Sequence, residues 1–129
     1  MLTYNPENPP EPDDWLSADE SERIVVVQQW HKQARVKLPN EKAHAVFHVI
    51  VENQLAENLE SVVRAVPRLM KQGLSRHDAV HAVGWVLASY IHELLTSDKK
   101  SNDQNDVHAR YSAEVERLTA KAWQAQAKE

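Results

Sequence analysis

The 129-residue chain contains no cysteine and only two glycines. Without cysteine it can form no disulfide, no thiolate zinc site and no thiol nucleophile, so any metal ion has to be bound by His, Asp and Glu side chains. An excess of basic residues is missing as well, since 15 Lys and Arg stand against 19 Asp and Glu and give a formal net charge of −4. Because phosphate backbones favour clustered positive charge, we predict that the protein has no nucleic-acid partner.

Long apolar runs are also missing. The hydrophobic segments are interrupted by His or Gly and are shorter than the roughly 20 residues that a membrane-spanning helix requires. The N-terminal segment, MLTYNPENPPEPDD, is acidic and rich in proline, and it has neither the basic start nor the apolar stretch of a secretory signal. We therefore expect a cytoplasmic protein without a membrane partner.

Residues 1–16 differ in composition from the rest of the chain. Four of the six prolines lie within residues 1–14, together with a run of acidic residues. Because proline fixes φ and lacks an amide donor, we expect no helix here and predict an extended, solvated arm, which Tyr4 or Trp15 could dock onto the body. Residues 17–129 have the size of one domain, and we predict that they form a single helical one.

The periodicity of residues 17–129 predicts an all-α fold of four to five helices, because apolar residues recur at three and four positions and sustained two-residue alternation is missing. Residues 96–105 contain no apolar side chain and predict an exposed loop. The third helix contains Pro67, so it either kinks there or begins late. The expected helices cover about residues 18–36, 41–57, 59–72, 75–95 and 106–127.

Helix ends are marked by side chains that satisfy the terminal backbone groups. Ser17, followed by Glu20, predicts a capping box at the start of the first helix, and Asn40 is a good N-cap for the second. Gly73 is expected in the left-handed conformation that closes the third helix. Ser75 then predicts the start of the fourth helix.

Two arrangements of these helices fit the sequence, an up-down bundle and a short αα-repeat array. The array is suggested by an offset of 33 residues between two histidine pairs, which is the length of a helical-hairpin repeat. The last helix carries apolar residues among charged ones. It is expected to act as a lid on the fold, or as a surface for a homo-oligomer or another protein partner.

The histidine pairs are the most informative feature of the sequence. His44 and His48 are four residues apart in one expected helix, and His77 and His81 have the same spacing in another. Side chains at i and i+4 lie one above the other on a helix, so each pair can offer two imidazoles to one ion. Both pairs lie near the N-terminal ends of their expected helices. If the two helices run parallel, the pairs therefore lie at the same level of the fold, which predicts a four-histidine site for Zn²⁺, Mn²⁺ or Fe²⁺.

Other side chains could complete this site. Glu52 continues the face of the first pair, giving H-x3-H-x3-E, and His31 is a further candidate ligand. Glu41 and Asp78 are candidates for side chains that surround the metal ligands without binding the ion, because carboxylates offset the positive helix ends that a dication would otherwise approach. His92 is too far along its helix to join the same ion.

Non-metal and enzymatic interpretations are also open. Buried histidines often stay neutral and bind a carboxylate or carbonyl, in which case the chain is a non-catalytic interaction module. His77 and Asp78 begin an H-D-x-x-H sequence that is similar to the zincin motif with a shorter acid. A metal-dependent phosphohydrolase of the HD type is a further alternative, whose ligand order would use His44 or His48, the His77-Asp78 doublet, and Asp98 or Asp106.

The segments EKAHAVFHVIVENQLA and LMKQGLSRHDAVHAVGWVLASYI resemble a family of uncharacterised bacterial helical domains, in which an H-x3-H…E-N-Q element precedes R-H-D/E-A-x-H-A. The similarity covers about residues 22–95. It implies no reaction, since the activity of the family is unknown, but it adds candidate residues beside the histidines. The positions that match its motif are His44, His48, Asn53, Gln54, Arg76, His77, Asp78 and His81, with His31 as a further candidate.

Overall fold

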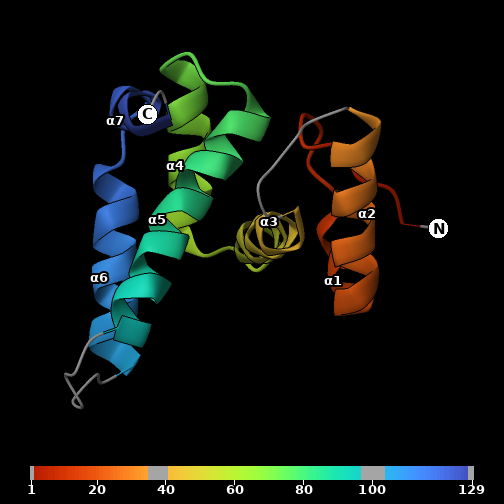
Figure 1. Ribbon diagram of the computed structural model, residues 1–129, viewed down its shortest axis with the longest axis horizontal. Helices are drawn as coiled ribbons and strands as arrows, with labels where there is room; N and C mark the ends of the chain where they lie inside the picture. Colours follow the sequence, from red (N-terminus) through yellow and green to blue (C-terminus); the bar gives the residue numbers. More distant parts are fainter. Residues whose placement is uncertain (1, 35–40, 97–103, 128–129) are drawn as a thin grey trace.

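The computed structural model describes residues 2–34, 41–96 and 104–127, and its regular elements within these ranges are all helices (Figure 1). The all-α prediction is confirmed. The predicted number of four to five helices is wrong, because the described ranges contain seven. These are α1 (Pro12–Ser17), α2 (Glu20–Gln33), α3 (Glu41–Ala56), α4 (Glu60–Lys71), α5 (Arg76–Thr96), α6 (Gln104–Arg117) and α7 (Ala120–Ala127).

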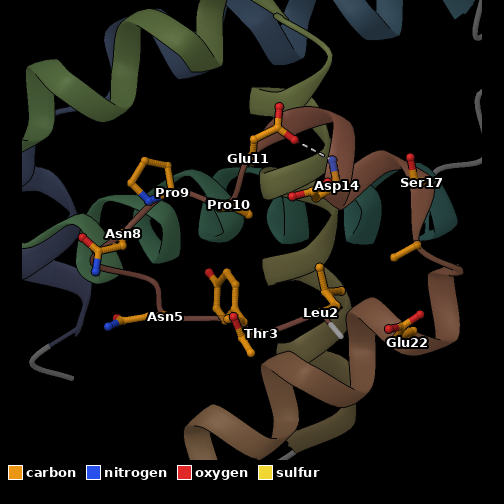
Figure 2. A pocket seen from close by; sticks show the side chains of 12 residues that line it. Leu2, Thr3, Asn5, Asn8, Pro9, Pro10, Glu11, Asp14, Ser17 and Glu22 are labelled. Carbon is orange, nitrogen blue, oxygen red and sulfur yellow. Dashed lines mark hydrogen bonds between the residues drawn. The ribbon is translucent and has the colours of Figure 1, made fainter.

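One additional helix, α1, lies in the arm that was expected to be extended. Pro12 takes the first helical position, where an amide donor is not needed. The Glu11 carboxylate caps the helix by accepting the backbone N–H of Asp14 at 2.7 Å (Figure 2). Trp15 is fully buried and Tyr4 is 9% exposed. The prediction that the arm is solvated and contains no helix is therefore wrong. The expected docking of Tyr4 or Trp15 onto the body is confirmed, because both side chains are buried.

The second helix starts differently from its prediction. Ser17 ends α1 instead of capping the next helix, since its hydroxyl donates to the carbonyl oxygen of Asp13 at 2.6 Å. Asp19 is the N-cap residue of α2. Arg23 on α2 donates to the carbonyl oxygen of Ala18, which binds the end of α1 to the start of α2.

The turns on either side of α4 use left-handed residues. Asn58 has a φ of 61° after α3, and Gly73 has a φ of 108° after α4, which confirms the predicted role of Gly73. The Ser75 hydroxyl accepts the backbone N–H of Asp78 at 3.1 Å, so the predicted cap of α5 is confirmed. The predicted N-cap Asn40 lies outside the described residues.

The last predicted helix is divided in two, with α6 ending at Arg117 and α7 beginning at Ala120. Leu118, between them, is buried, and its carbonyl oxygen accepts a hydrogen bond from Arg68. In the third predicted helix, α4 runs from Glu60 through Pro67, so a late start is wrong. Most of the predicted loop over residues 96–105 lies outside the described ranges.

The helix α3 lies between two hydrophobic cores. Figure 1 shows it end-on, with α1 and α2 on one side and α4, α5 and α6 on the other. Ala45 and Val49 of α3 pack with Tyr4, Trp15 and residues of α2 in the smaller core. Val51 of α3 packs with α4, α5, α6 and α7 in the larger core.

The axes of α3 and α5 cross instead of running parallel, as the end-on view of α3 makes plain (Figure 1). This crossing departs from an up-down bundle, whose helices are close to parallel or antiparallel. The repeat-array interpretation, the domain boundary at residue 17 and a partner surface on the last helix stay predictions. Within the described ranges, no helix combines the length and the apolar character needed to cross a membrane.

The two glycines allow a matched test of the backbone. Gly73→Ala places a side chain at φ 108° and should lower the free energy of unfolding by about 1 to 2 kcal/mol. Gly84→Ala in the interior of α5 should raise it by up to about 1 kcal/mol, because the new Cβ would lie 3.9 Å from Phe47 and Val51 in ordinary contact. Urea unfolding measures both changes. Equal effects of the two substitutions would contradict the left-handed conformation of Gly73 and the helical conformation of Gly84.

Candidate metal centre

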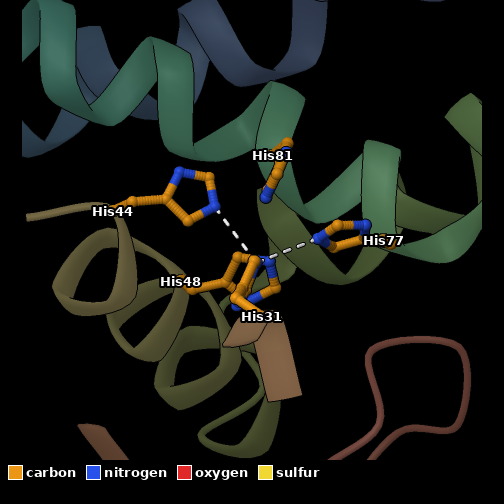
Figure 3. A group of neighbouring side chains, drawn as sticks. All are labelled: His31, His44, His48, His77 and His81. Carbon is orange, nitrogen blue, oxygen red and sulfur yellow. Dashed lines mark hydrogen bonds between the residues drawn. The ribbon is translucent and has the colours of Figure 1, made fainter. Parts of the chain in front are cut away.

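Five histidines from three helices converge where α2, α3 and α5 meet (Figure 3). Each offers one ring nitrogen, and these nitrogens all lie within 4.8 Å of one another. The i, i+4 spacing places two imidazoles on one face of α3 and two on one face of α5, and the crossing of the helices brings those faces together. We call this group the histidine cluster; it consists of His31 from α2, His44 and His48 from α3, and His77 and His81 from α5.

His31 occupies the middle of the cluster. Its Nδ1 lies 2.8 Å from the carbonyl oxygen of Val27, and because a carbonyl can only accept, Nδ1 carries the hydrogen. The Nε2 of neutral His31 therefore presents a lone pair, 3.2 Å from the Nε2 atoms of both His44 and His77. Nitrogens that bind one ion tetrahedrally at about 2.0 to 2.1 Å are about 3.3 Å apart, so this spacing is that of metal ligands.

His48 is oriented by a chain of hydrogen bonds that begins at a buried ion pair. Arg76 donates to both carboxylate oxygens of Glu52 at 2.8 Å, and their side chains are 7% and 1% exposed. The Tyr4 hydroxyl donates to Glu52 at 2.6 Å, so its oxygen is left to accept from His48 Nδ1 at 2.9 Å. His48 thus carries its hydrogen on Nδ1.

This tautomer turns the Nε2 lone pair of His48 away from the chain of hydrogen bonds. The Nε2 atoms of His48 and His81 are both buried, and neither has a hydrogen-bond partner. A buried polar atom without a partner is uncommon in a folded protein, because its lost contact with water is not compensated. The histidine cluster therefore contains two unsatisfied ring nitrogens, and the one on His48 presents a lone pair that a metal ion would satisfy.

The environment of the cluster keeps its imidazoles neutral. Burial, together with the repulsion between neighbouring imidazolium charges, lowers the pKa of His44 to about 4 and that of His81 to about 2. The same causes lower the pKa of His48 well below its ordinary value, and burial lowers the pKa of His31 and His77. A metal ion binds neutral imidazole, so no proton has to be displaced at neutral pH.

Carboxylates around the cluster supply negative charge without being part of it. Glu41 acts on His31, and Asp78 and Glu7 act on His77, in each case raising the pKa of the histidine against the larger effect of burial. Such charges favour a cation, and they offset the positive N-terminal ends of α3 and α5. Glu41 and Asp78 thus lie in electrostatic range of the cluster, and the arm residue Glu7 joins them.

One side of the cluster is closed by Trp30 from α2. Its ring centroid lies 5.0 Å from that of His31 and 4.8 Å from that of His77, and both pairs meet edge to face. No motif in the sequence predicts this contact of Trp30 with the histidines.

The remaining candidate residues have other contacts. Glu52 was a candidate metal ligand, but it is not among the clustered donors. Its carboxylate binds Arg76 and Tyr4 instead, so it lies behind His48. Asn53 accepts hydrogen bonds from the Trp15 indole and from Arg23. Gln54 accepts one from the hydroxyl of Tyr111. Of the residues added by the family resemblance, only Arg76 connects to the cluster, through Glu52 and Tyr4.

Sequence reasoning missed the role of Tyr4 at the cluster. An aromatic residue within a proline-rich, acidic arm was the available signal, and it predicted docking without naming a partner. The hydrogen bond joins residues 44 positions apart, so no local periodicity could reveal it.

The pKa shifts predict that the metal-free fold is sensitive to acid. An unfolded chain protonates its histidines below about pH 6.5, whereas the folded protein keeps His44 neutral to about pH 4 and His81 to about pH 2. The unfolded state therefore binds more protons in this interval, so stability is complete above about pH 6.5 and is lost as the pH falls.

We expect the melting temperature in the presence of a chelator to fall by at least about 5 °C from pH 7 to pH 5 and to change little from pH 7 to pH 8. Circular dichroism measures the transition. A melting temperature that is constant down to pH 5 would show that the histidines are not buried in their neutral form.

Comparison with known proteins assigns no role to the histidine cluster. The similarity to bacterial helical domains with paired histidines stays a prediction. No protein-family model, no curated protein and no solved structure matches this chain.

Proposed function

We propose that the protein binds one divalent transition-metal ion at the histidine cluster. The observation that carries this proposal is the orientation of the imidazoles. His31 and His48 each donate Nδ1–H to a fixed acceptor, which leaves a lone pair on Nε2. The Nε2 of His31 faces His44 and His77, and the Nε2 of His48 is buried without a hydrogen-bond partner. Metal-bound histidines are held in this way, with the second ring nitrogen donating to a carbonyl or to a group linked to a carboxylate.

The donor atoms favour some metals over others. The cluster offers imidazole nitrogens alone, without a carboxylate or a thiolate among the five donors. Imidazole suits Zn²⁺, Fe²⁺, Ni²⁺ and Cu²⁺, whereas Mg²⁺, Ca²⁺ and Mn²⁺ prefer oxygen ligands. Of the three metals considered from the sequence, we therefore favour Zn²⁺ and Fe²⁺ over Mn²⁺.

Purely structural histidines are less well supported. A structural role would be served by imidazoles whose buried nitrogens are satisfied by neighbouring carboxylates or carbonyls. Instead, the contacts at the centre of the cluster are between histidines, and the Nε2 atoms of His48 and His81 have no partner. The interaction-module alternative stays a prediction for the outer surface.

The phosphohydrolase alternative also lacks a supporting observation. Such a site needs carboxylate ligands beside the histidines, and the clustered donors include none. Asp98 lies outside the described residues. The backbone N–H of Asp78 is part of the Ser75 cap, and its carboxylate is not among the clustered donors.

Metal analysis tests the proposal directly. Protein purified without a histidine tag or a chelator should contain, or take up, about one equivalent of Zn²⁺ or Fe²⁺, and the ion should raise the melting temperature by about 5 °C or more. Elemental analysis and thermal denaturation provide the two readouts. Less than about a tenth of an equivalent, with no thermal shift on adding either metal, would rule out the proposal.

Substitutions assign the ion to the cluster. His44→Ala and His77→Ala each remove one half-buried ligand and should weaken Zn²⁺ binding more than about a hundredfold, because loss of a direct ligand exceeds the effect of losing an outer partner. His108→Ala is the matched control, since His108 is exposed on α6 and lies outside the cluster. Binding that is weakened equally in all three variants would place the ion elsewhere.

Tyr4→Phe tests the chain of hydrogen bonds behind His48. It removes the donor to Glu52 and the acceptor for His48, so the free energy of unfolding should fall by about 1 to 3 kcal/mol. Zn²⁺ affinity should fall by about tenfold to a hundredfold.

The control is Tyr90→Phe, because the Tyr90 hydroxyl is buried without a hydrogen-bond partner. That substitution should leave stability unchanged or raise it slightly, and should leave Zn²⁺ affinity unchanged. Titration calorimetry and urea unfolding measure the two quantities. Unchanged Zn²⁺ affinity in Tyr4→Phe would mean that Tyr4 has only a structural role.

A further inference from the structure

A hollow of about 240 Å³ adjoins the histidine cluster, and Trp30 is not among the residues that line it. Three members of the cluster, His44, His48 and His81, form one of its walls. A wider hollow of about 740 Å³ lies between the arm, α1 and α2 (Figure 2), but none of the clustered histidines lines it. The smaller hollow is therefore the one that bears on the chemistry of the cluster.

The other walls of this hollow are apolar. They come from α3, from α5 and from α7, which brings the C-terminal part of the chain to the cluster. No Asp, Glu, Lys or Arg is among the residues that line it. The walls beside the histidines are Phe47, Val80, Gly84, Trp85, Ala88 and Trp123.

The histidines of the cluster thus differ in their surroundings. The indole of Trp30 packs against the rings of His31 and His77, and neither of these histidines lines the hollow. Both histidines of α3 and one histidine of α5 border the hollow instead. The unpartnered Nε2 atoms belong to His48 and His81, which both line the hollow.

We propose that this hollow binds a small, uncharged aromatic molecule whose single nitrogen or oxygen donor reaches the metal ion in the histidine cluster. The inference rests on the proposed metal centre and names the class of ligand that the centre takes. A charged body is disfavoured, because burying a charge among these walls would leave it unpaired. An aromatic body is favoured, because the rings of Phe47, Trp85 and Trp123 offer faces and edges to pack against.

The volume limits the size of the ligand. An apolar cavity of about 150 Å³ holds benzene, so a hollow of about 240 Å³ accepts one aromatic ring with a substituent, or two small linked rings. A peptide or a nucleotide is larger than this volume.

The experiment uses the full chain loaded with Co²⁺, whose visible absorption bands change when a donor atom joins the metal. Imidazole provides the donor alone, and 4-phenylimidazole provides the same donor with an apolar ring. We expect both to shift the bands, and 4-phenylimidazole to bind at least about tenfold more tightly, because its phenyl ring is removed from water. Equal affinities, or bands that neither compound changes, would overturn the inference.

Ala88→Leu tests the position of the ligand by filling the hollow from the half-buried face of α5. The advantage of 4-phenylimidazole should disappear, while imidazole affinity should change less than about twofold. Ala109→Leu on the exposed face of α6 is the matched control and should keep the advantage. A retained advantage in Ala88→Leu would place the aromatic ring elsewhere.

The amount of Co²⁺ bound is measured first for every variant, which separates the two proposals. If wild-type protein binds no Co²⁺, both this inference and the metal centre fail. If Co²⁺ binds normally but the phenyl group brings no gain, only this inference fails. Should Ala88→Leu not fold, Trp123→Ala removes an aromatic wall instead and should weaken 4-phenylimidazole binding at least about fivefold without affecting imidazole.

Discussion

The buried ion pair between Arg76 and Glu52 is the interaction on which the rest of the structure depends. Moving two charges out of water is unfavourable unless their hydrogen-bonding capacity is satisfied. Both carboxylate oxygens accept from the guanidinium, and Tyr4 adds a further donor to Glu52. Arg76 also donates to the carbonyl oxygen of Pro6, and its backbone N–H donates to Glu7. The ion pair thus joins α3 and α5 to the N-terminal arm, and each of its partners requires the others to be in place.

This arrangement connects a structural requirement to the chemistry of the histidine cluster. Tyr4 can accept from His48 only because its own hydrogen is donated to Glu52. Burial, and then the nearby Glu52 charge, raise the pKa of Tyr4 well above its ordinary value, so the hydroxyl keeps that hydrogen. The orientation of one imidazole is therefore fixed through three successive side chains. Such outer contacts commonly decide whether a histidine presents its lone pair to a metal ion.

The parts of the structure that could be predicted from the sequence are those that depend on local spacing. The i, i+4 pairs indicated shared faces on two helices, and Ser75 and Gly73 marked the start of α5 and the turn before it. The crossing of α3 and α5, and the hydrogen bond from the arm to His48, depend on packing between distant segments. Glu52 shows the difference clearly. Its spacing from His48 suggested a metal ligand, but its carboxylate forms a buried ion pair with Arg76 and is not among the clustered donors.

The position of α3 in both hydrophobic cores has a consequence for how the protein opens. Its residues Ala45 and Val49 belong to the smaller core and Val51 to the larger one, so neither core can come apart without exposing part of the same helix. Local unfolding usually proceeds in contiguous cooperative units. A helix shared by two such units is covered by each of them, so it is fully exposed only when both have opened. The donors of the histidine cluster lie on α3, on α2 beside the smaller core and on α5 in the larger core, so the complete cluster exists only while both cores are closed.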